Sequence, residues 1–134
     1  ATLHLVVRKK IQELFALARE TQRDGRPLAC DPILRLRLAQ LYLEGEYLKL
    51  LSERALSASV HGRAGAEGSL VKLVWSQTQQ HLCEVAAELL GPEAAHHALG
   101  WQRVHARSLS IAGGTTQVNK NIVAQRVLGL PRGV

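Results

Sequence analysis

The stretch SIAGGTTQVNKNIVAQRVLGLP, residues 110–131, decides the fold, because it sets a double-glycine turn directly against the start of an amphipathic helix. Glycine lets backbone N–H groups approach a ligand closely, and a helix N-terminus carries partial positive charge. Together these features can seat a phosphate or a carboxylate. Two glycines before a helix are more often a simple turn, so both interpretations stay open on local grounds.

The same stretch resembles the C-terminal signature of the acyl-CoA dehydrogenases, flavoproteins that desaturate acyl-CoA thioesters, and the likeness has no gap. Two further segments resemble that family in the same order. Residues 31–39, DPILRLRLA, look like the start of its second long C-terminal helix, and residues 67–76, EGSLVKLVWS, look like the start of its third. The resemblance covers essentially the whole chain and implies the helical C-terminal domain of such an enzyme.

Hydrophobic spacing independently predicts helices. Apolar residues recur every three to four positions over four stretches. The expected helices span residues 3–23, 32–60, 69–90 and 116–128. Breaks rich in glycine and proline separate them, and Asp31–Pro32 favours a helix start because aspartate caps and proline fits the first turn. This order predicts an all-α fold, an antiparallel four-helix bundle.

Several positions carry specific expectations. Gly45 falls on the inner face of the second helix, where it permits close helix contact. The polar run Gln77–His81 is expected to be exposed, with a subunit interface or ligand groove as alternatives, and Glu93–Ser108 is expected to be a connection with a short helical turn. The residues expected to face inward are Val7, Ile11, Leu14, Leu17, Ala18, Leu34, Leu38, Leu41, Leu48, Leu51, Ala55, Leu70, Val74, Leu82, Val85, Leu89, Val118, Ile122 and Val127.

Composition indicates one ordinary globular domain over residues 1–134. The chain is 46% hydrophobic and 21% charged, and its low aromatic content of 4% suits packed helices with an aliphatic core. No apolar run reaches the roughly 20 residues that span a bilayer, and no signal-peptide pattern opens the chain. The net charge of +6 fits anionic ligands such as CoA or flavin phosphates, although a solvated surface explains it equally well. Because arginine and lysine are scattered, we expect no nucleic-acid partner.

Cysteine and histidine give no sign of a metal site. Cys30 and Cys83 form no CxxC pair, and His96–His97 has no third ligand nearby in the sequence. We therefore expect no metal, free thiols and a cytoplasmic location.

The resemblance implies FAD as cofactor and an acyl-CoA as substrate. In the family a glutamate removes the α-proton while the β-hydrogen leaves as hydride to the flavin, and in many members that glutamate directly precedes the Gly-Thr of the signature. The matching residue here is Gly113. Other members carry the base on the first helix of this domain, where Glu13 and Glu20 lie, but no motif supports either. The catalytic base is therefore unknown.

The remaining family positions match unevenly. Thr115, Thr116 and Gln117 match positions that touch the nucleotide half of FAD, and Gly114 matches the position that approaches the acyl-CoA; either threonine also suits a plain helix cap. The Gln-x-Leu-Gly-Gly motif that reaches the neighbouring subunit's FAD appears as Glu88–Pro92. An Arg-x-x-Phe-Gly motif, near Thr21–Gly25, is not preserved.

The sequence therefore predicts the C-terminal domain of an FAD-dependent acyl-CoA dehydrogenase-like oxidoreductase. Such an enzyme acts on CH–CH groups in fatty acid and lipid metabolism and introduces an α,β double bond into an acyl-CoA thioester. The family's N-terminal and middle domains are absent from this chain, so we expect no activity from it alone. The resemblance also implies an electron-transfer flavoprotein-type acceptor and a homo- or hetero-oligomer, dimer or tetramer. The alternative is a non-catalytic structural subunit of a hetero-oligomeric dehydrogenase.

Overall fold

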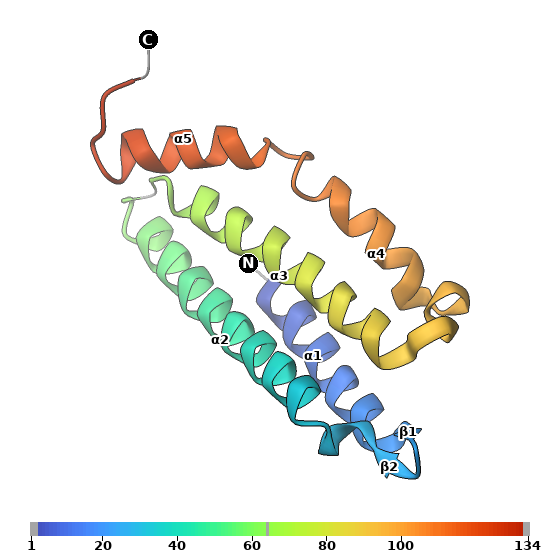
Figure 1. Ribbon diagram of the computed structural model, residues 1–134. Coiled ribbons are helices and arrows are strands. Elements are labelled where there is room, and N and C mark those ends of the chain that lie inside the picture. Colours follow the sequence, from blue (N-terminus) through green and yellow to red (C-terminus); the bar gives the residue numbers. More distant parts are fainter. Residues whose placement is uncertain (1–2, 64, 133–134) are drawn as a thin grey trace.

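The fold is a bundle of helices in which one helix occupies the centre (Figure 1). The computed structural model describes residues 3–63 and 65–132. Helix α3 contacts each of the other four α-helices. Helix α5 lies across the end of the bundle at which α2 ends and α3 begins (Figure 1). The helices are α1 (Leu3–Glu20), α2 (Pro32–Val60), α3 (Glu67–Leu90), α4 (Ala98–Ser108) and α5 (Thr116–Arg126). The predicted all-α bundle is confirmed.

Helix α1 ends three residues earlier than expected because a small hairpin follows it. Strand β1 (Gln22–Arg23) pairs antiparallel with β2 (Arg26–Pro27), and a short 3-10 helix, η1 (Leu28–Cys30), leads to α2. Asp31 then caps α2 as predicted, since its Oδ1 accepts hydrogen bonds from the N–H groups of Ile33 at 2.8 Å and Leu34 at 3.2 Å.

The predicted close helix contact at Gly45 is also confirmed, and the helix that approaches there is α1. A Cβ added at Gly45 would lie 2.8 Å from Cδ1 of Ile11, so a side chain there would require the end of the Ile11 side chain to shift. The core around this contact is aliphatic, as expected. Its buried members include Val7, Ile11, Leu14, Ala18, Leu34, Leu38, Leu41, Leu48, Leu82, Val85 and Leu89.

The prediction that Gln77–His81 is an exposed face is wrong. Thr78 and Gln79 are buried, and within this run only Gln77 is exposed. The reason is the central position of α3, which has neighbours on several sides and little free surface at its middle. Two polar side chains of the run bond to other helices: Gln80 Nε2 donates to the backbone oxygen of Ala106 at 3.2 Å, and His81 Nδ1 lies 2.9 Å from Glu44 Oε1.

The prediction that residues 93–108 form a connection is wrong as well. After a 3-10 segment, η2 (Gly91–His96), the chain forms the 11-residue helix α4. Polar contacts attach α4 to the bundle: Lys10 Nζ donates to Gln102 Oε1 at 2.9 Å, and Arg107 Nη2 lies 2.6 Å from Glu84 Oε1. Polar contacts of this kind do not require regularly spaced apolar residues. The sequence of residues 93–108 therefore shows only a weak helical pattern.

The two cysteines are both free, as predicted, but they have opposite surroundings. Cys30 is exposed and Cys83 is buried. Burial raises the pKa of the Cys83 thiol above its ordinary value of 9.0, with a smaller contribution from Glu84 and opposing ones from Lys10 and Arg107. The folded chain therefore holds this proton to higher pH than the unfolded chain does, so the free energy of unfolding falls as pH rises past that ordinary pKa.

We expect a difference in thiol reactivity that follows from this. At pH 8, a thiolate-specific reagent should label Cys30 rapidly and Cys83 only after unfolding, because the thiolate is the nucleophile and burial disfavours it. Peptide mapping of the labelled protein, with and without urea, measures both rates. Equal labelling of the two cysteines in the native protein would contradict the buried environment of Cys83.

Among the described residues, no helix is long and apolar enough to cross a membrane, and no group of three or more His, Cys, Asp or Glu side chains is placed to hold a metal ion.

Candidate functional site

The double-glycine turn connects α4 to α5 and has a backbone that favours glycine. Gly113 has φ +67° and Gly114 has φ +96°. A Cβ added at Gly114 would also lie 3.0 Å from Nδ2 of Asn119. The conformation of the turn therefore requires residues that tolerate a positive φ. The backbone of the two glycines carries no side chains and lies directly before the positive end of α5.

Two side chains that the sequence analysis did not single out hold this turn in place. Lys72 Nζ, from α3, donates to the backbone oxygen of Leu109 at 2.6 Å and, more weakly, to that of Gly114 at 3.4 Å. Asn119 Nδ2 donates to the backbone oxygens of Gly114 at 2.9 Å and Thr115 at 3.1 Å. The lysine charge also suits its place beyond the C-terminus of α4, where carbonyl groups carry partial negative charge.

These contacts explain an error about α5. Val118 and Val127 were expected to face inward, yet they are 48% and 43% exposed, and Ile122 is only half-buried. The buried residue of α5 is Asn119. Asn119 is buried because its amide bonds to carbonyl groups of the turn that precedes α5, so the buried position of this helix is polar and not part of an apolar stripe. The sequence did contain a signal for this buried polar position: Asn119 lies near the start of a helix that directly follows a glycine turn.

The residues predicted to contact FAD gather at the start of α5. Thr115 is the N-cap, and its Oγ1 accepts a hydrogen bond from the Val118 N–H at 3.2 Å. The Thr116 N–H donates to the backbone oxygen of Ser110 at 3.0 Å, which closes the turn. Gln117 is exposed in the first helical turn. Hydroxyl and amide groups at a helix N-terminus are a donor set that suits a phosphate or ribose.

The chain offers no carboxylate at the position of the family's glutamate. Gly113 is exposed, and its nearest neighbour for an added Cβ is Lys72 Cε at 3.8 Å. Glu13 and Glu20 on α1 are also exposed. Helix α1 ends at Glu20 beside the hairpin, at the opposite end of the bundle from α5 (Figure 1). A base for α-proton removal needs a desolvated site, which neither glutamate has within this chain.

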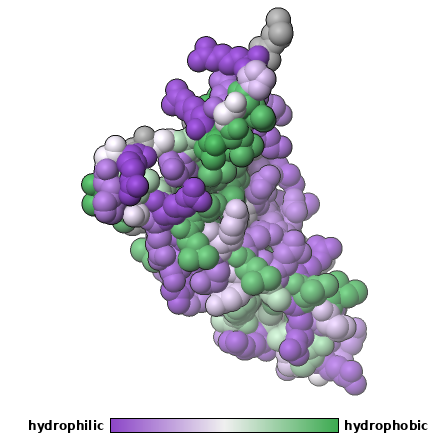
Figure 2. Space-filling view, turned by 90° about the vertical axis from the view of Figure 1, so that its left-hand side faces the viewer, coloured by the Kyte–Doolittle hydropathy of each residue, from purple (hydrophilic) through white to green (hydrophobic). Residues whose placement is uncertain are grey.

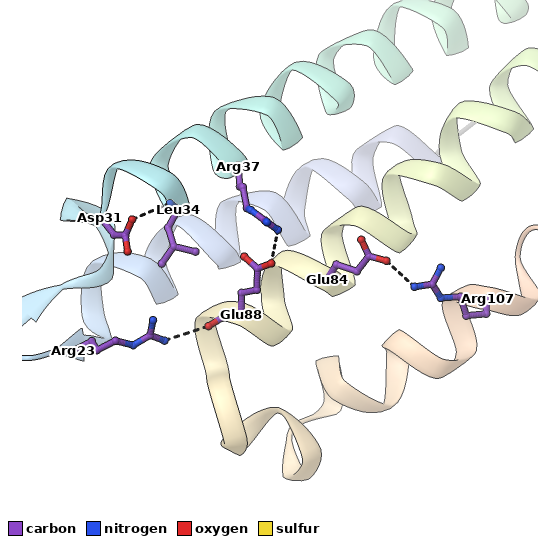
Figure 3. A network of polar contacts seen from close by, with 7 residues as sticks. All are labelled: Arg23, Asp31, Leu34, Arg37, Glu84, Glu88 and Arg107. Carbon is purple, nitrogen blue, oxygen red and sulfur yellow. Dashed lines mark hydrogen bonds and ion pairs between the residues drawn. The ribbon is translucent and has the colours of Figure 1, made fainter.

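The far end of α3 carries a second cluster, where Glu88 replaces the amide of the family's motif. Figure 3 shows the Glu88 side chain pointing to Arg37 of α2, with Nη1 of Arg37 and Oε1 of Glu88 forming an ion pair. Arg23 from the hairpin donates through Nη2 to the backbone oxygen of Glu88 at 3.3 Å. The negative charge introduced at Glu88 is thus offset by Arg37.

An open hollow of about 690 Å³ adjoins this cluster, between the hairpin and the start of α2. Arg23 and Arg26 line it, and so do Asp24, the capping Asp31 and the exposed Cys30, so that the formal charges of the lining balance. The lining of this hollow therefore does not favour an anion over a cation.

The two tryptophans differ, since one packs against the core and the other lies on the surface. Trp75 is half-buried and packs against the core. Trp101 is exposed and stacks on His105, with ring centroids 5.5 Å apart. Both residues of this pair, like Arg107, lie on α4 and not in the loop expected from the sequence.

Comparison with known proteins gives consistent matches. The family model described as acyl-CoA dehydrogenase, C-terminal domain, matches residues 1–128. Acyl-CoA dehydrogenase IpdE1 of Mycobacterium tuberculosis is 31% identical over 137 aligned residues, which cover 96% of this chain and 33% of that protein. The chain thus spans about a third of that curated relative.

Solved structures show the same fold. The FAD complex of PigA superposes with a TM-score of 0.85 at 22% identity, over 96% of this chain and 34% of that one. The ChsE4–ChsE5 complex from Mycobacterium tuberculosis gives a TM-score of 0.83 at 24% identity, over 96% and 36% of the two chains.

Proposed function

This chain belongs to the acyl-CoA dehydrogenase family, whose C-terminal domain it matches, and we propose that it completes the FAD and acyl-CoA site of a dehydrogenase. That enzyme would introduce an α,β double bond into an acyl-CoA thioester, working with the family's N-terminal and middle domains. The observation that carries the proposal is the double-glycine turn, held by Lys72 and Asn119, that leads into the Thr115-capped start of α5.

The residues of this turn fit the two ligands. Thr115, Thr116 and Gln117 would hold the nucleotide half of FAD, because their donors and the positive end of α5 suit phosphate and ribose oxygens. Gly114 would let the acyl-CoA approach the backbone, because glycine has no side chain to keep a ligand away. FAD, when bound, supplies the hydride acceptor. Lys72 and Asn119 would keep the turn carbonyls engaged and the turn fixed.

The rest of the reaction requires groups outside this chain. A carboxylate from another part of the enzyme would remove the α-proton, because Gly113 carries none. An electron-transfer flavoprotein-type acceptor would reoxidise the flavin, and the enzyme would work in the cytoplasm as an oligomer.

A second candidate is a non-catalytic subunit of a hetero-oligomeric dehydrogenase. Two observations favour it: Gly113 stands where many members carry the base, and Glu88 is paired with Arg37 where the family motif has an amide. Such a subunit would keep the bundle and complete a site whose base comes from its partner.

An absorbance spectrum of the full-length protein, before and after a panel of acyl-CoAs, distinguishes the two candidates. A flavin band that bleaches with one acyl-CoA supports the dehydrogenase and begins to identify its substrate. A colourless protein, or a yellow one that no acyl-CoA bleaches, supports the non-catalytic subunit.

Substitutions at the start of α5 test the FAD assignment. Thr115→Ala and Gln117→Ala should each lower the flavin content of the purified full-length protein by several-fold, while its helical circular dichroism stays unchanged. Thr115→Ser keeps the capping hydroxyl and should retain flavin. Gln125→Ala, on the same helix, is the matched control for Gln117 and should retain flavin as well. Full flavin occupancy in both alanine variants would remove these residues from the cofactor site.

A further inference from the structure

The turn between α4 and α5 leaves three successive backbone N–H groups without an acceptor among the described residues. They belong to Gly113, Gly114 and Thr115. The N–H groups of Ala112 and Thr116, on either side, donate to backbone oxygens nearby in the chain. A ligand oxygen at this turn therefore finds free donors, provided that the turn keeps them pointing outward.

The direction of the last of these N–H groups is set by the carbonyl group to which it is joined. A peptide unit is planar and trans, so its C=O and N–H point in opposite directions. The backbone oxygen of Gly114 accepts from Asn119 Nδ2 at 2.9 Å and, more weakly, from Lys72 Nζ at 3.4 Å. The N–H of Thr115 shares that peptide unit and therefore points away from both side chains.

Lys72 differs from Asn119 in joining the turn to the rest of the bundle. Asn119 lies on α5, so it moves together with the turn that it binds. Lys72 lies on α3, and its bonds to Leu109, at 2.6 Å, and to Gly114 are the only side-chain hydrogen bonds that the described part of α3 makes to residues 109–115. The polar attachment of the turn to the central helix thus depends on one ammonium group.

The charge of Lys72 also bears on the turn. No ion pair among the described residues includes this lysine. Its side chain is half-buried, and its Cε would lie 3.8 Å from a Cβ added at Gly113. Lys72 therefore adds positive charge beside the N-terminus of α5, and both sources of charge favour a ligand oxygen that is negative.

Apolar residues reach the surface at the same end of the molecule. On and after α5, Val118 is 48% exposed and Leu128 is 65% exposed. Figure 2 shows apolar surface near the end of the molecule at which the C-terminal segment lies. Gathered apolar surface is typical of a contact with another part of a protein. Once this end is covered, the charge of Lys72 acts in a less polar medium, where its interactions are stronger.

We propose that Lys72 is a positioning residue of the enzyme. It fixes the glycine turn on α3 so that the free N–H groups face the ligand, and its charge strengthens their attraction for a ligand oxygen. This role rests on the proposed function, because FAD and the acyl-CoA are taken to bind at this turn. It extends the site to α3, outside the segment 110–131 that carries the family signature.

Replacing Lys72 by methionine in the full-length protein removes the ammonium group and keeps an apolar stem. Lys72→Met should raise the dissociation constant for FAD about tenfold, the effect of losing one hydrogen bond to a charged group. Lys10→Met is the matched control, since Lys10 is also a half-buried lysine that joins two helices, through Gln102 at 2.9 Å, and it should leave the constant unchanged. Lys72→Arg keeps the charge and should restore most of the affinity. Titration of each apoprotein with FAD, followed by flavin fluorescence, gives the constants.

Hydrogen exchange tests the positioning in the absence of any ligand. In Lys72→Met, the bonded N–H groups of Ala112 and Thr116 should exchange several-fold faster, while those in the middle of α3 stay protected. In Lys10→Met, the same two groups should exchange at the wild-type rate. Mass spectrometry of peptides that cover residues 109–119 measures these rates. If circular dichroism shows that Lys72→Met does not fold, Lys72→Gln, which keeps a neutral donor, replaces it in both measurements.

The possible results separate the role of Lys72 from the proposed function. The role of Lys72 alone is overturned if the wild-type protein binds FAD and Lys72→Met binds it equally well, even with faster exchange in the turn. Equal losses of affinity in Lys72→Met and Lys10→Met, or a Lys72→Arg variant as weak as Lys72→Met, also overturn it. A wild-type protein that binds neither FAD nor any acyl-CoA overturns the proposed function and, with it, the role of Lys72.

Discussion

Replacing Leu82 by alanine should lower the free energy of unfolding by about 2–5 kcal/mol, the largest stability effect we expect from a single truncation. Leu82 is fully buried on α3, and α3 contacts every other α-helix of the described chain. The cavity therefore opens at the centre of the bundle, where several elements would have to move to fill it.

The matched control is Leu5→Ala. Leu5 is also a helical leucine, but about half of its surface is exposed, so its truncation should change stability by no more than about 0.5 kcal/mol. Urea unfolding followed by helical circular dichroism measures both variants. If Leu82→Ala lowered the free energy of unfolding as little as Leu5→Ala does, the interior around α3 would be loosely packed.

Replacing Gly114 by alanine should remove flavin and also destabilise the chain. The left-handed backbone costs roughly 1–2 kcal/mol for a residue with a Cβ. In addition, the new methyl group would lie 3.0 Å from Asn119 Nδ2, and the amide that holds the carbonyls of Gly114 and Thr115 would have to move. The turn would then lose the shape on which the proposed FAD and acyl-CoA contacts depend.

Gly62→Ala separates the two effects. Gly62 also has a positive φ, +66°, but a Cβ there would meet nothing within 4 Å. It should show the backbone cost alone and keep its flavin. Flavin absorbance and thermal unfolding, measured together on both variants, give the comparison. Equal flavin loss in the two would show that global destabilisation, and not the turn, releases the cofactor.

The main features of the fold could be predicted because the first three helices follow simple rules. The apolar spacing of α1 and α2, the Asp31 cap and the Gly45 contact each depend on residues close in sequence or on one face of one helix. The family signature added the order of the elements.

The errors have a common physical origin in polar contacts between distant residues. Helix α4 is attached through pairs such as Lys10–Gln102, and the turn before α5 is held by Lys72 of α3, so apolar spacing predicted neither α4 nor the buried face of α5 correctly. At the candidate site, the glycines and Thr115 were predictable from local sequence. Lys72 was not, because its bond to Leu109 joins residues 37 positions apart.

The straightness of α3 imposes a distance on the molecule. Lys72, which holds the glycine turn, and Glu88, which pairs with Arg37, stand on one continuous helix, roughly 24 Å apart at 1.5 Å per residue. The two ends cannot come closer together unless the helix itself breaks. The two ends therefore cannot contact the same phosphate group, and α3 acts as a spacer that sets the separation of whatever binds at each end.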